Sequence, residues 1–152
     1  MITNELELTQ AQADALLRVG KIFLDKSSIV VNRPFNFRRD LQSVANQEDK
    51  FYLNVSQTSI EFSKYSTTTR FFSIPLARAC ISEDAIHENP DGEMIRGPHI
   101  HIYKEGYNDC FAEPLEKHGF TTTEIANFLD EFLKYCFIEK IDIVDQRILK
   151  NE

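Results

Sequence analysis

The spacing of apolar residues changes twice along this chain, from about 3.6 residues to two and back to about 3.6. Between residues 9 and 25 apolar side chains recur at helical spacing, and Thr9 and Gln12 have the spacing of a capping box at a helix start. From residue 28 to residue 80, apolar and polar residues alternate in short runs separated by polar turns. Helical spacing returns at residues 122–137. This order of elements predicts an α+β domain.

The alternating runs predict an antiparallel β-meander of about five to six strongly curved strands, flanked by an N-terminal and a C-terminal helix on one face. We expect the sheet to extend from about Val30 to Tyr103 and the helices to span Thr9–Asp25 and Thr122–Phe137. Pro75 cannot donate a ladder hydrogen bond, so it predicts a bulge or a sheet edge. The chain has 152 residues and is expected to form a single domain over residues 1–152.

Composition excludes some classes of protein. The chain has 17 Lys and Arg residues against 24 Asp and Glu, a net charge of −7, which disfavours non-specific nucleic-acid binding but leaves room for a local basic patch. Cys80, Cys110 and Cys136 lack zinc-knuckle or redox spacing and are expected to be reduced thiols. No apolar run approaches the roughly 20 residues of a membrane span, and the first residues carry acidic charge where a secretory signal is basic. We therefore expect a cytoplasmic protein without a membrane partner.

The densest group of chemically active side chains lies at residues 96–107, directly after Ile81–Gly97, an acidic stretch that is predicted to be a loop. If residues 99–105 form a strand, Ile100 and Ile102 enter the core, and the polar side chains between them share the other face. The loop contributes a further histidine and the preceding strands contribute two arginines. The candidate catalytic residues are therefore His99, His101, Tyr103, His87, Arg70 and Arg78.

One use of these residues is acid–base chemistry on RNA. Imidazoles exchange protons near neutral pH, so His99 and His101 can share the roles of base and acid in phosphodiester cleavage. Arg70 or Arg78 would then stabilise the charged phosphate.

A second use is metal binding. His99, His101 and Glu105 offer two nitrogens and an oxygen from one strand, which suits a first-row transition metal. The pattern resembles the first half of the cupin metal motif, whose second half is absent. The identity of any cofactor is otherwise left open. A third possibility is purely structural, with the two histidines holding the loop through Asp91 or Glu93.

Three motifs resemble a known family: His87-x-Asn89-Pro90-Asp91-Gly92-Glu93, Pro98-His99-x-His101-Ile102-Tyr103-x-Glu105-Gly106-Tyr107 and Ala112-x-Pro114-Leu115. They are similar to an uncharacterised domain family of small single-domain proteins in bacteria and prophages. The resemblance also covers the first helix, a hairpin at Asn54–Lys64 and the last helix. Members have Trp two residues before the Ala, where this chain has Cys110, which implies that a flat stacking surface is missing here.

A shorter likeness is to small Pro-His-x-His proteins encoded beside antitoxins or on mobile elements. It implies a setting of phage–host conflict or of toxin–antitoxin type. Two functions follow in that setting. One is a ribonuclease-like toxin that acts on RNA with the histidines. The other is a non-enzymatic acidic binding protein, such as an anti-defence or anti-CRISPR-type inhibitor, whose partner is a protein such as an antitoxin or a defence component. The oligomeric state is left open.

Overall fold

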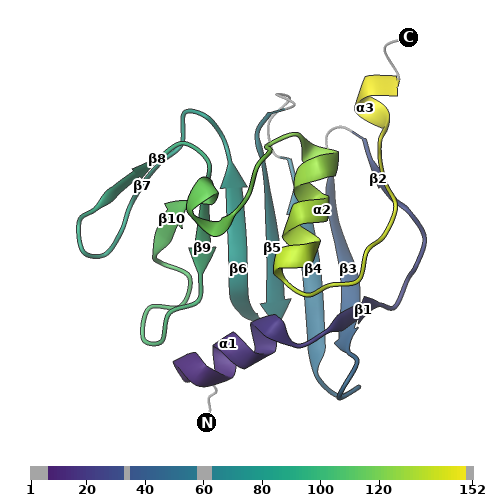
Figure 1. The fold of residues 1–152 in the computed structure, drawn as a ribbon, viewed down its shortest axis with the longest axis horizontal. Helices are drawn as coiled ribbons and strands as arrows, with labels where there is room; N and C mark the ends of the chain where they lie inside the picture. Colours follow the sequence, from purple (N-terminus) through teal and green to yellow (C-terminus); the bar gives the residue numbers. More distant parts are fainter. Residues whose placement is uncertain (1–6, 33–34, 58–62, 150–152) are drawn as a thin grey trace.

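A computed structural model describes residues 7–32, 35–57 and 63–149 and has the expected α+β class, with the helices packed on one face of a sheet (Figure 1). The main sheet has seven strands, one or two more than expected, and each neighbouring pair is antiparallel. In spatial order the strands are β1 (Lys21–Phe23), β3 (Asn36–Ser43), β4 (Lys50–Ser56), β5 (Tyr65–Phe71), β6 (Ile74–Ile81), β9 (His99–Ile102) and β10 (Ala112–Pro114). The sheet is open, with β1 and β10 at its edges.

Two short sheets complete the strand count. β2 (Ile29–Val31) pairs in parallel with β11 (Ile143–Asp145). β7 (Ile86–Glu88) and β8 (Met94–Arg96) form a hairpin where a loop was expected at Ile81–Gly97. The turn signal in that stretch was read correctly, because the Gly92 N–H donates to the Asn89 carbonyl at 2.8 Å and closes the hairpin. The residues on both sides of the turn pair with each other, which a turn signal alone does not show.

The helices are shorter than expected. α1 (Gln10–Arg18) begins at the predicted capping box, in which Thr9 and Gln12 each bond the other's backbone N–H. It ends before residue 25 because Val19 is extended and the next residues join β3 as strand β1. α2 (Ile125–Tyr135) lies within its expected range, preceded by the 3-10 helix η1 (Leu115–His118) and followed by α3 (Gln146–Leu149). Among the residues described, no helix is long and apolar enough to cross a membrane.

The core lies between the helices and one face of the sheet. Phe51 and Leu53 of β4 and Phe128 and Phe132 of α2 are fully buried there. Side chains alternate along β4, so its polar residues point to the opposite face, which the helices leave uncovered. The bulge predicted at Pro75 is confirmed, because the β5–β6 register shifts next to it. The expected hairpin at Asn54–Lys64 includes residues 58–62, which lie outside the described part of the chain.

Lys21 connects the two long helices from inside the protein. Its side chain is 1% exposed, and Nζ donates hydrogen bonds of 2.8 Å to the carbonyls of Leu17, Val19 and Cys136. These carbonyls lie at the C-terminal ends of α1 and α2, where the helix dipole favours a positive charge. Three N–H donors require the protonated amine, so Lys21 is an ammonium ion in the fold.

Candidate functional site

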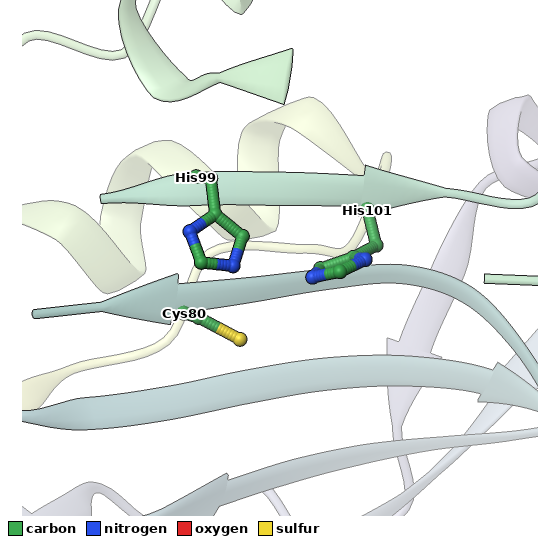
Figure 2. Close-up of side chains that lie close together, drawn as sticks. All are labelled: Cys80, His99 and His101. Carbon is green, nitrogen blue, oxygen red and sulfur yellow. The ribbon is translucent and has the colours of Figure 1, made fainter. Parts of the chain in front are cut away.

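Strand β9 places two histidines on the sheet face that the helices do not cover. Ile100 between them is buried in the core, as expected, so His99 and His101 point the other way. The neighbouring strand β6 places Cys80 directly opposite His99 and Arg78 directly opposite His101. Figure 2 shows the Cys80 side chain near both imidazoles, which extend from β9 toward β6.

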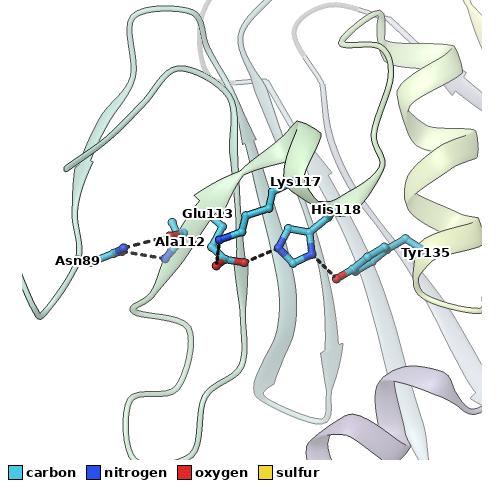
Figure 3. A network of polar contacts seen from close by, with 6 residues as sticks. All are labelled: Asn89, Ala112, Glu113, Lys117, His118 and Tyr135. Carbon is cyan, nitrogen blue, oxygen red and sulfur yellow. Dashed lines mark hydrogen bonds and ion pairs between the residues drawn. The ribbon is translucent and has the colours of Figure 1, made fainter. Parts of the chain in front are cut away.

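The β7–β8 hairpin adds a third imidazole. The ring centroid of His87 lies 4.6 Å from that of His101 and 5.8 Å from that of His99. The hairpin is held in place by Asn89, which is buried and bonds both the N–H and the carbonyl of Ala112 in β10 at 2.8 and 3.0 Å (Figure 3). We call the group of Cys80, His87, His99 and His101 the histidine cluster.

Each imidazole of the cluster is held by a backbone carbonyl. Nδ1 of His99 lies 2.8 Å from the Gly97 oxygen, and Nδ1 of His101 lies 2.9 Å from the Asp109 oxygen. For His87 the contact uses Nε2, which lies 2.8 Å from the Cys110 oxygen. A carbonyl oxygen only accepts hydrogen bonds, so each of these nitrogens carries the proton. In a neutral ring the second nitrogen then has a free lone pair.

Burial keeps the rings of His99 and His101 neutral. His99 is 4% and His101 is 1% exposed. Burial lowers the pKa of both, and together with the nearby Arg78 guanidinium it lowers the pKa of His101 to about 4. Burial also raises the pKa of the Cys80 thiol, an effect that Arg78 opposes. At neutral pH the cluster therefore presents lone pairs on His99 and His101 and a protonated thiol.

Three members of the cluster are close enough to share a metal ion. One ligand atom from each of Cys80, His99 and His101 lies within 4.8 Å of the other two. Ligands of a tetrahedral zinc ion, with bonds of about 2.0–2.3 Å, are roughly 3.3–3.8 Å apart. Small side-chain rotations therefore bring the three atoms to bonding distance.

Arg78 lies next to the cluster on β6, two residues before Cys80 and directly opposite His101. Its Nε donates to Asp109 Oδ2 at 3.0 Å, and Nη1 contacts the Cys80 sulfur at 3.3 Å. The guanidinium thus favours the thiolate form of Cys80 that a metal requires.

The structure separates the other predicted site residues from the cluster. The hydroxyl of Tyr103 donates to the Leu8 carbonyl at 2.7 Å inside the core, because β9 ends at Ile102 and the alternation stops there. The Glu105 carboxylate is exposed and accepts from the Gln10 N–H at 2.9 Å. Arg70 bonds Asn54 at 2.9 Å on β4. The cluster thus contains His87, His99 and His101 with Arg78 beside them, and Cys80 occupies the place expected for Glu105.

Cys80 and Asp109 were not predicted as site residues. Neither belongs to a local motif, and only the pairing of β6 with β9 and the return of the chain into β10 bring them to the histidines. The loop acids proposed to hold the histidines do not do so. Asp91 accepts from the Glu93 N–H, and the imidazoles bond backbone carbonyls instead.

The fourth histidine belongs to a separate polar network (Figure 3). His118 Nε2 lies 2.7 Å from Glu113 Oε1, and its Nδ1 lies 3.0 Å from the Tyr135 hydroxyl. Lys117 also binds Glu113, at 3.0 Å. This network joins β10 and η1 to α2, so His118 serves as an internal control for the cluster.

A family model described as "Family of unknown function (DUF6978)" matches residues 8–138 of this chain. No curated protein and no solved structure matches it. The matched range contains every residue of the histidine cluster.

Proposed function

The chain belongs to DUF6978, a family of unknown function, and we propose that its histidine cluster binds a first-row transition metal ion, with zinc as the first candidate. Imidazole nitrogens with one thiolate form a ligand set that suits zinc and its neighbours in the periodic table.

One observation carries the proposal. Donor atoms of Cys80, His99 and His101 lie within 4.8 Å of one another, and both imidazoles donate their second ring nitrogen to a backbone carbonyl. Metal-ligating histidines are held by the same arrangement, because the carbonyl selects the tautomer and orients the ring.

His87 lies outside the group of three close donor atoms and would have to move toward them to become a fourth ligand. Its Nε2 is used on the Cys110 carbonyl, which leaves Nδ1 for the metal. Three imidazoles and one thiolate would complete the tetrahedral coordination that zinc adopts in structural sites. Because His87 sits on the β7–β8 hairpin, bound metal would join that hairpin to the main sheet.

The geometry gives less support to acid–base cleavage of RNA at this cluster. That mechanism needs one histidine charged and one neutral near pH 7, in contact with the substrate. Burial holds the pKa of His101 at about 4, and His99 and His101 are almost inaccessible. Ribonuclease activity and a role in phage–host conflict stay predictions, which assays of RNA degradation and bacterial growth test.

The test is the metal content of protein purified without a polyhistidine tag from zinc-supplemented medium. We expect elemental mass spectrometry to find about one zinc ion per protein chain. His101→Asn and Cys80→Ser should each lose most of it. His118→Gln and Cys110→Ser remove the same kinds of ligand outside the cluster and should retain it.

Cobalt substitution reports the ligands directly. Cobalt bound to the wild type should show a thiolate-to-metal charge-transfer band that Cys80→Ser removes and Cys110→Ser preserves. The proposal is refuted if the wild-type protein is purified without bound metal and then binds neither zinc nor cobalt when these are added.

A further inference from the structure

The sheet face that carries the histidines is polar across the neighbouring strands as well. Residues that lie directly opposite one another on five successive strands, β3 to β6 and β9, form one row: Arg38, Asn54, Thr68, Arg78 and His101. With strands about 4.8 Å apart, the row extends for roughly 19 Å. Both long helices lie on the other face of the sheet (Figure 1).

An aromatic ring between two guanidinium groups lies at the centre of this face. Arg38 and Arg70 approach the ring of Tyr52, with distances of 4.9 and 4.8 Å from the guanidinium carbon to the ring centroid. Arg70 is opposite Tyr52 on β5, and its Nε is held by Asn54 at 2.9 Å. The side chain of Arg38 is 55% exposed, so this stack is accessible to a ligand.

The charge of this face is opposite to that of the whole protein. The described residues of β3 to β6 place Arg38, Lys50, Arg70 and Arg78 on it. Two of them are ion-paired, Arg38 with Asp40 at 3.2 Å and Arg78 with Asp109 at 3.0 Å, so these six residues keep a net charge of +2. The chain as a whole has a net charge of −7. A local positive field on an acidic protein favours a polyanion over a neutral ligand.

We propose that this face binds single-stranded RNA. Guanidinium groups pair with phosphates and also stack on bases, so the Arg38 and Arg70 guanidinium groups that Tyr52 supports can take unpaired bases on their outer sides. The absence of helices on this face and the spacing of the arginines across several strands fit an extended strand. Duplex RNA would hide its bases from the Tyr52 stack. The inference does not depend on metal binding by the histidine cluster.

Binding can be measured by fluorescence anisotropy with a short labelled oligouridylate at low salt. We expect saturable binding that weakens with salt, with a log–log slope of about −2 for three phosphate contacts. Tyr52→Leu should weaken binding by about 5- to 150-fold, the range for loss of one stacked base. Arg70→Gln should weaken binding and make the slope less steep by about 0.7.

The matched control is Arg18→Gln, which removes the same charge from the exposed last turn of α1. It should bind like the wild type. The proposal is overturned if the wild type does not bind the oligonucleotide, if it binds an RNA duplex or an acidic peptide more tightly, or if Arg18→Gln weakens binding as much as Arg70→Gln. Circular dichroism verifies that each variant is folded. His99→Asn should bind RNA as the wild type does, which separates this test from that of the metal site.

Discussion

The imidazole of His87 packs edge-on against that of His101, with ring centroids 4.6 Å apart. The first ring comes from the β7–β8 hairpin and the second from the main sheet, so the contact joins two elements that share no β-ladder. A ligand that binds both rings would stabilise the folded state at this junction.

Zinc should therefore stabilise the protein against unfolding. At a free zinc concentration one hundred times the dissociation constant, the free energy of unfolding rises by about 2.7 kcal/mol. Differential scanning calorimetry should show a higher Tm for the wild type and for His118→Gln, but not for His99→Asn. An equal shift in His99→Asn would place the zinc elsewhere.

A second prediction concerns Asn89, which holds the β7–β8 hairpin on β10. Asn89→Ala would leave the N–H and carbonyl of Ala112 without their side-chain partner in a buried position. We expect a loss of about 1–3 kcal/mol in the free energy of unfolding, measured with urea, and weaker zinc binding because His87 is no longer held in place. Asn127→Ala, on an exposed side chain of α2, should change stability by less than about 0.5 kcal/mol. A normal zinc affinity in Asn89→Ala would show that the hairpin does not contribute to the site.

Lys21 predicts a specific pH dependence. Burial lowers its pKa from 10.5 to about 8, so between these values the unfolded chain binds the proton more tightly than the folded chain. The contribution of Lys21 to the free energy of unfolding must then rise with pH in this window, by up to about 3 kcal/mol.

The measurement compares the wild type with Lys21→Met in urea at several pH values. At pH 7 the variant should be less stable by at least about 2 kcal/mol, because three buried carbonyls lose their donor. The gap should widen between about pH 8 and pH 10. Lys140→Met, at an exposed site, should show no such change. A gap that stays constant with pH would mean that the pKa of Lys21 is not lowered by folding.

Tyr103 should matter for stability and not for the site. Tyr103→Phe removes a hydroxyl that donates to the Leu8 carbonyl at 2.7 Å and accepts from the Leu8 N–H at 3.1 Å. We expect the free energy of unfolding to fall by about 1–3 kcal/mol, with zinc content unchanged. Tyr107→Phe, at a 47% exposed position, is the control for stability. If folded Tyr103→Phe protein loses its metal, Tyr103 contributes to the metal site after all.

The features that the sequence determined by itself are local in origin. The α+β class follows from the change in apolar spacing, and the start of α1 follows from Thr9 and Gln12, which are one helical turn apart. The bulge follows from the missing N–H of Pro75. The shared face of His99 and His101 follows from the alternation along a single strand, which holds for any register with its neighbours.

Only the tertiary structure decided which residues join those histidines. Cys80 reaches them through the β6–β9 register, and His87 through the docking of the hairpin on Ala112. Tyr103 and Glu105 leave them because the strand ends at Ile102. Register, docking and strand ends depend on contacts between residues far apart in the chain, and the sequence pattern around any one of them does not contain that information.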